Sequence, residues 1–193
     1  MLSAGAAAGA VTAYETPLQP PIIPADVAKL TVTSTTFPSG GTIPIPNVSK
    51  GCGKGQTDGA DVSPQISWTP GPAGTASYVV TIFDTDAPTG VGFWHWLVFN
   101  IPANVTSLAL DASRSGMPAG AVQGYGDAGV SMYHGPCPPV GDPPHHYWIT
   151  VSAMSTTFAS SFGPGTGGAR LAFLMSKAGK VLARGQYLGL YGR

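Results

Sequence analysis

Charged side chains are scarce in this sequence. Asp, Glu, Lys and Arg make up 9% of its 193 residues, against roughly 25% in a typical soluble domain. Nine basic and nine acidic residues give a formal net charge of zero, so there is no broad positive field to attract nucleic acid or an anionic membrane surface. A charged ligand would have to be held locally by a few groups.

Long apolar runs are also missing. No run approaches the ~18 residues that a membrane-spanning helix requires, so we expect a soluble protein. The chain holds 27 glycines and 19 prolines, and 43% of it is hydrophobic. This composition argues against long exposed helices and against disorder of the whole chain, and it predicts a mainly β domain rich in turns.

Cysteine is rare, with Cys52 and Cys137 lying 85 positions apart. They form no redox C-x-x-C motif and no zinc cluster. Two alternatives stay open: a disulfide between two loops, which we favour, or two unrelated buried thiols. A disulfide would suit a secreted or periplasmic protein, with a cytoplasmic one as the alternative.

Residues 1–27 predict a flexible leader rich in proline and alanine, without a core of its own. Its first 13 residues are either the remnant of a secretory signal or a plain tail. Residues 28–193 are predicted to form a single domain.

Two strong strands are predicted to pair in the middle of this domain. Residues 77–83 are nearly all β-branched or aromatic, which is typical of a strand covered on both faces, and residues 94–101 are the expected partner. Strict alternation would place His95, Leu97 and Phe99 on one face and Trp94, Trp96 and Val98 on the other.

Another strand is predicted at residues 145–154, where His145 and His146 must point to opposite faces. One helix is predicted at residues 168–178, because Leu171, Leu174, Met175 and Ala178 recur at helical spacing before Gly179. Residues 181–183 and 186–191 are predicted to be extended.

The stretch from 83 to 100, FDTDAPTGVGFWHWLVFN, concentrates chemistry. Two carboxylates, Asp84 and Asp86, precede a histidine, His95, that stands between two tryptophans. These side chains lie where the two paired strands approach each other, so we expect the rim of a binding site there.

Four ordered motifs then carry a family resemblance: SPQISW (63–68), DTDAPTG (84–90), FWHWLVFNIP (93–102), and GPCPP (135–139) with HHY (145–147). The chain resembles the phosphatidylethanolamine-binding protein family, in its bacterial and archaeal Raf-kinase-inhibitor-like branch. The resemblance implies a large central antiparallel sheet, a smaller second sheet and one or two short helices. It also implies non-catalytic binding of phosphate-type anions or phospholipid headgroups in a small pocket, without a cofactor.

The resemblance also implies which residues form the site. The ligand-binding residues would be Asp84, His95, Gly135, Pro138, His145 and Tyr147, supported by Asp86, Trp94 and Tyr133 behind them. No catalytic residue and no metal ligand is implied. Because a carboxylate repels a phosphate, we expect Asp84 to orient a histidine or to accept a headgroup ammonium.

The chain departs from the family pattern at two positions. Thr85 stands where a proline is common, and His146 where an arginine is common. Alternation points this position away from the pocket. The replacement of arginine by His146 therefore puts an ion pair with Asp86 in doubt rather than ligand binding. Without the resemblance, Asp86 is a turn former and His95 a core histidine.

Two other functions compete with anion binding. Asp84, Asp86, His95 and His145 offer the donor types of a zinc-dependent hydrolase, although their spacing matches no zinc motif. A kinase or serine-protease inhibitor would act instead through a surface loop, with residues 38–61 and 163–168 as candidates. If both histidines of the pocket supply positive charge, phosphate affinity should rise as the pH falls through about 6.5.

Overall fold

Strands dominate the structure, a computed structural model that describes residues 27–53, 58–159, 162–177 and 180–193. These residues hold ten strands, one α-helix and a short 3-10 helix. The elements are β1 (Ala28–Lys29), β2 (Val32–Thr33), β3 (Gly41–Thr42), η1 (Ile45–Asn47), β4 (Ile66–Trp68), β5 (Ser77–Asp84), β6 (Phe93–Pro102), β7 (Ser107–Leu108), β8 (Val122–Gln123), β9 (His145–Met154), α1 (Gly168–Lys177) and β10 (Val181–Tyr191).

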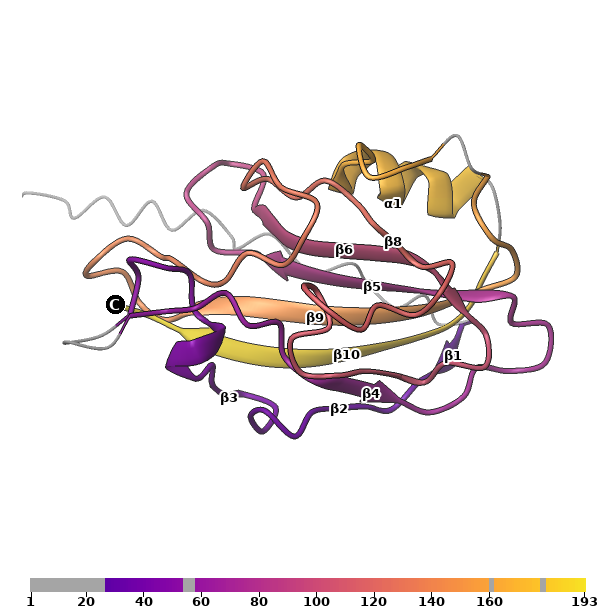
Figure 1. The fold of residues 1–193 in the computed structure, drawn as a ribbon, viewed down its shortest axis with the longest axis horizontal. Coiled ribbons are helices and arrows are strands. Elements are labelled where there is room, and N and C mark those ends of the chain that lie inside the picture. The colour runs from indigo at the N-terminus through magenta and orange to yellow at the C-terminus, as the bar shows by residue number, and fades with distance from the viewer. Residues whose placement is uncertain (1–26, 54–57, 160–161, 178–179) are drawn as a thin grey trace, which may run out of the picture.

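The large sheet has seven strands in the order β1-β10-β9-β5-β6-β8, with β3 also pairing with β10. Its four long strands lie side by side in Figure 1, and each neighbouring pair among them is antiparallel. The predicted fold class is confirmed, with one correction. The short strands β1 and β3 pair in parallel with β10, so the sheet is mixed rather than wholly antiparallel.

The interior of this sheet is β5, all eight of whose residues are buried. Its run of Val, Ile, Tyr and Phe suits a strand covered on both faces, as predicted. β9 and β6 flank it on either side. The predicted partner strand at residues 94–101 is therefore confirmed, and it begins one residue earlier, at Phe93.

Different elements cover the two faces of the large sheet. On one face Leu171 of α1 packs with Val79, Leu97 and Phe99. On the other face a larger cluster joins the large sheet to the three-stranded sheet β2-β4-β7. α1 and β4 accordingly lie on opposite sides of the long strands (Figure 1).

The predicted helix is confirmed as α1, which ends at Lys177, while Ala178 and Gly179 lie outside the described residues. Except for Val27, the predicted leader also lies outside them. Within the part of the chain that the structure describes, no helix has the length and apolar character needed to cross a membrane.

Candidate functional site

A cavity of about 230 Å³ lies at the end of the large sheet where β5 finishes and where β6 and β9 begin. Because β5 is antiparallel to both neighbours, Asp84 at its end pairs with Phe93 on β6 and with Tyr147 on β9. We call the cavity the histidine pocket. It is lined by Asp84, Ala87, Pro88, Thr89, Phe93, His95, His134, Gly135, Cys137, Pro138, Pro139 and His145.

Asp84 is 3% exposed and holds two parts of the site together. Its Oδ1 accepts the Asp86 backbone N–H at 2.9 Å, and its Oδ2 lies 2.8 Å from Nδ1 of His145. Burial by itself lowers the pKa of His145, but the hydrogen bond and charge of Asp84, with further help from Asp142, raise this pKa above its usual 6.5. The carboxylate of Asp84 therefore favours the protonated form of His145.

His95 has the opposite charge state. Its Nδ1 lies 2.7 Å from the backbone carbonyl oxygen of His134, which only accepts hydrogen bonds, so Nδ1 carries the proton. Burial of the ring lowers its pKa to about 4, against the opposing effect of Asp84. At neutral pH the ring is uncharged and its Nε2 is an acceptor. Of the two histidines, His95 therefore does not supply positive charge at neutral pH.

The face predicted for His95 is also wrong, because a β-bulge interrupts the alternation. Ile82 pairs with Trp96 and Phe83 with Trp94, so His95 is an extra residue on β6. Trp96 packs in the cluster beneath the small sheet, and the His95 ring meets Tyr147 of that same cluster edge-on, with centroids 5.2 Å apart. A bulge re-aims side chains in this way, and here it turns His95 into the pocket.

Trp94 is turned to the other face. It packs against the cluster under α1 and against Phe83, with ring centroids 4.4 Å apart. Trp94 was predicted to support the ligand-binding residues from behind, but the same bulge sends this side chain to the opposite side of the sheet.

The loop before β9 closes the pocket. The N–H of Gly135 donates to Asp61 Oδ1 at 2.7 Å, and a Cβ on Gly135 would lie 2.4 Å from the backbone of residues 47–49, so a side chain is excluded there. Cys137 forms a disulfide with Cys52, with Cα atoms 5.2 Å apart. Of the two alternatives left open for the cysteines, the structure has the disulfide.

Two buried tyrosines stand behind the histidines. Tyr147 is 1% exposed, and its hydroxyl has no hydrogen-bond partner among the described residues. Burial and the negative charge of Asp84 raise its pKa. Tyr133 donates its hydroxyl proton to the Asn47 carbonyl at 2.7 Å. Neither tyrosine lines the cavity, so both support it from behind.

Asp86 faces away from the pocket and closes the turn. Its Oδ2 lies 2.6 Å from the backbone nitrogen of His146 and 2.8 Å from the ring Nδ1 of the same residue. His146 thus makes the contact that was in doubt for this position. As predicted, His145 and His146 point to opposite faces of β9, one buried and the other exposed.

The sequence analysis gave His134 no role in the pocket. Its ring lines the cavity and lies nearly parallel to that of His95, with centroids 6.4 Å apart. Its backbone N–H also donates to the His95 carbonyl oxygen, at 3.1 Å. Its position next to Gly135 was the signal in the sequence that pointed to it.

In the described residues, no group of three or more His, Cys, Asp or Glu side chains is placed to hold a metal ion. Of the four residues considered for zinc, Asp84 and His145 are bonded to each other and Asp86 is bonded to His146.

Comparison with known proteins shows the family of the chain. The family model for phosphatidylethanolamine-binding protein matches residues 33–192. The chain belongs to this family. Among curated relatives, UPF0098 protein YbcL of Escherichia coli K12 is 45% identical over 135 residues, covering 68% of this chain and 72% of that protein. UPF0098 protein YbhB of the same organism is 41% identical over 123 residues, covering 63% and 75%.

Solved structures of the phosphatidylethanolamine-binding protein family match the fold. E. coli YbcL, described as a new member of the mammalian PEBP family, has a TM-score of 0.77 at 38% identity and covers 86% of this chain and 99% of its own. The PEBP homologue CT736 of Chlamydia trachomatis has a TM-score of 0.70 at 27% identity and covers 86% and 98%.

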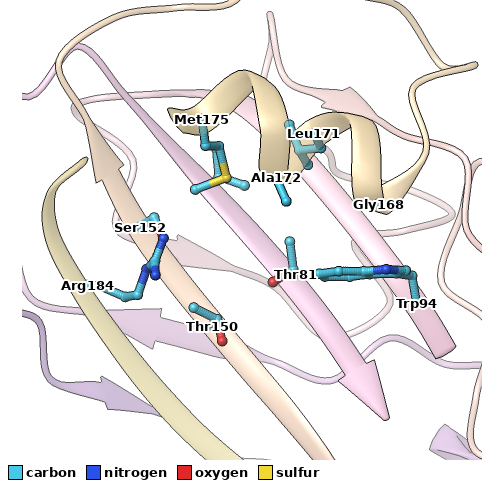
Figure 2. Close-up of a pocket in the computed structure, with 10 residues that line it drawn as sticks. Thr81, Trp94, Thr150, Ser152, Gly168, Leu171, Ala172, Met175 and Arg184 are labelled. Carbon is cyan, nitrogen blue, oxygen red and sulfur yellow. The ribbon is translucent and has the colours of Figure 1, made fainter. Parts of the chain in front are cut away.

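A second cavity of this family member, also about 230 Å³, lies under α1 on the other face of the sheet (Figure 2). We call it the helix cavity. Leu171, Ala172 and Met175 of α1 point into it from above. Its floor is a polar strip across three strands, where Thr81 pairs with Thr150 and Ser152 with Arg184.

Proposed function

We propose that this protein binds a phosphate-type anion in the histidine pocket without catalysing a reaction on it. The observation that carries the proposal is the contact of the buried His145 ring with Asp84 at 2.8 Å, which raises the histidine pKa, in a cavity lined by two further histidines. Hydrogen bonds from charged donors to phosphate oxygens are among the stronger ones. The membership of the chain in the phosphatidylethanolamine-binding protein family supports the same ligand chemistry.

The two buried histidines offer complementary groups to a ligand. His145 is a charged donor, whereas the neutral His95 offers an acceptor at Nε2 because its Nδ1 is bonded to a carbonyl oxygen. A ligand that carries an anionic oxygen together with an O–H or N–H group satisfies both. A protonated phosphate and an ethanolamine phosphate headgroup both have this chemistry.

The size of the pocket favours a small ligand. Its volume of about 230 Å³ is below the roughly 300–1,000 Å³ of sites for drug-sized molecules. A phosphate or a headgroup fits this volume, and the acyl chains of a lipid would stay outside.

One group of side chains has the composition of a hydrolytic triad. Ser49 Oγ lies 3.3 Å from His134 Nε2, and Asp61 Oδ1 lies 3.6 Å from His134 Nδ1. Ser49 is only 4% exposed, and the same Asp61 oxygen already accepts the Gly135 N–H at 2.7 Å. A nucleophile needs access to substrate and a base that is itself oriented, so these contacts favour a structural role and support a non-catalytic site.

We also infer that the protein works in an oxidising compartment, secreted or periplasmic. The Cys52–Cys137 disulfide supports this, because such bonds persist mainly outside the cytosol. Thiol alkylation and mass spectrometry of the native protein, trapped in cells, would contradict the inference if both cysteines were found reduced.

Calorimetry with inorganic phosphate and with glycerophosphoethanolamine tests the function. We expect His145→Gln to weaken binding at least tenfold, since a hydrogen bond to a charged group contributes about 1.5–3 kcal/mol. Thr81→Val, in the helix cavity, is the matched control and should bind like wild type. Absence of binding by wild-type protein up to about 10 mM ligand, or equal binding by His145→Gln, would contradict the proposal.

A further inference from the structure

Both ring nitrogens of His145 face carboxylates of the chain itself. Asp84 Oδ2 lies 2.8 Å from Nδ1, and Asp142 Oδ2 lies 3.3 Å from Nε2. An imidazolium has two N–H groups, one on each nitrogen. The Nε2–H group that a phosphate would need is therefore already hydrogen-bonded to the carboxylate of Asp142.

The two carboxylates differ in how they are held. The Asp84 side chain is 4% exposed and is fixed at the end of β5. The Asp142 side chain is 39% exposed and belongs to the loop before β9. Asp84 is thus a permanent partner of His145, whereas Asp142 lies at the boundary with solvent.

The loop that carries Asp142 is lightly attached. The Asp142 N–H reaches the Pro139 carbonyl oxygen at 3.4 Å and the Gly141 N–H reaches that of Arg193 at 3.3 Å, both long for hydrogen bonds. Val140 in the same loop is 78% exposed. A partly exposed carboxylate that turns into water regains hydration, which the buried Asp84 cannot do. Displacing Asp142 from Nε2 therefore costs less than displacing Asp84 from Nδ1 would.

We propose that Asp142 is an internal competitor, whose carboxylate takes the position on His145 that a phosphate oxygen occupies when the ligand binds. This inference rests on the proposed function and concerns how the affinity of the same pocket is regulated. An N–H group directs one hydrogen bond along one axis, so the carboxylate and the phosphate cannot both bind Nε2. A phosphate monoester carries about −1.5 to −2 charges and displaces the single charge of Asp142. The replacement of Asp142 by phosphate at Nε2 therefore determines the affinity of the pocket for phosphate.

Removing the competitor should tighten binding. We expect Asp142→Asn to lower the Kd for inorganic phosphate about five- to tenfold, measured by calorimetry near pH 7 in a buffer without phosphate. Asn keeps the shape of the side chain and removes its charge. Asp142→Ala, which also removes the side-chain oxygen, should bind at least as tightly as Asp142→Asn.

Asp111→Asn is the matched control for a general change in charge. Asp111 is 37% exposed, close to the value for Asp142, but its carboxylate pairs with Arg114 at 3.0 Å. This variant should change the Kd less than twofold. Urea unfolding of each variant verifies that it is folded.

A second measurement does not depend on the ligand. NMR titration of the His145 ring should give a lower pKa in Asp142→Asn than in wild type, because Asp142 helps to raise it, and an unchanged pKa in Asp111→Asn. An unchanged His145 pKa in Asp142→Asn would overturn the inference, as would phosphate binding that is equal in wild type and Asp142→Asn. If neither protein bound phosphate, the proposed function would fail as well.

Discussion

The histidine pocket and the helix cavity have the same volume, about 230 Å³ each, but opposite chemistry. The first is built at strand ends and loops, and it gathers Asp84, His95, His134 and His145. The second lies over the middle of the strands, between α1 and a floor of hydroxyl groups. Strand ends are where the chain leaves the regular hydrogen-bond ladder, so side chains and loops from distant segments meet there. The middle of a sheet offers only its regular alternation.

The polar groups of the two cavities are also satisfied differently. In the histidine pocket, His145 is hydrogen-bonded to two carboxylates, which raise its pKa, whereas burial lowers the pKa of His95 to about 4 despite its hydrogen bond to a backbone carbonyl oxygen. In the helix cavity, Arg184 Nε donates to Ser152 Oγ at 3.0 Å and Gln186 Nε2 donates to Thr150 Oγ1 at 3.4 Å. Volume alone therefore does not distinguish the two cavities, whereas the ionisable groups that line them do.

The largest expected effect concerns the disulfide, which belongs to the histidine pocket. Replacing both Cys52 and Cys137 with alanine should lower the free energy of unfolding by about 4–5 kcal/mol in the chain-entropy account, since the bond spans 85 residues. Phosphate binding should weaken too, because Cys137 lines the pocket. Urea unfolding and calorimetry measure the two effects. If stability and phosphate affinity were both unchanged, the disulfide would not contribute to the site.

A smaller effect, confined to the other cavity, is expected from Leu171→Ala. Leu171 is 1% exposed and packs α1 onto the sheet, and truncating a core leucine costs about 2–5 kcal/mol. We expect a loss of about 3 kcal/mol in the free energy of unfolding and a phosphate Kd within twofold of wild type. A parallel loss of affinity would show that the cavities are coupled, and the contrast between them would fail.

The smallest effect is a pH dependence that only the histidine pocket should produce. His95 has a pKa of about 4 in the folded protein against 6.5 when unfolded, so between these values the unfolded chain binds the extra proton. Stability should fall by roughly 1.5 kcal/mol from pH 6.5 to pH 5. The raised pKa of His145 acts in the other direction, because its stabilisation is complete below 6.5 and is lost as the pH rises through its folded-state pKa.

Urea unfolding measured from pH 5 to alkaline pH separates the contributions of the two histidines to stability. His95→Gln should flatten the acid side of the profile and His145→Gln the alkaline side. Leu171→Ala should lower the whole curve without changing its shape. If the loss of stability towards acid pH persisted in His95→Gln, a group other than His95 would be taking up the proton.

Local patterns in the sequence were enough to predict several elements. Residues 77–83 and 145–154 are strands because their β-branched and aromatic runs bury on both faces, and α1 forms where apolar residues recur at helical spacing. The opposite directions of His145 and His146 also follow from local geometry, since β9 is regular at its start. Such predictions need no knowledge of distant contacts.

The errors came from long-range register. The bulge that re-aims His95 exists only because β5 and β6 pair with one residue in excess, and no pattern within β6 encodes that pairing. The position of His134 depends on a contact with His95, 39 residues away. The parallel pairing of β1 and β3 likewise depends on where β10 lies.

The sequence by itself determined a mainly β chain of low charge, its principal strands and helix, and the residue types of the histidine pocket, because composition and short-range periodicity depend on neighbours in the chain. Tertiary structure alone decided that the pKa of His95 is lowered and that of His145 raised, and that Asp142 contacts His145. A pKa depends on burial and on the partner across the pocket, and Asp84, the main partner of His145, is 61 residues away.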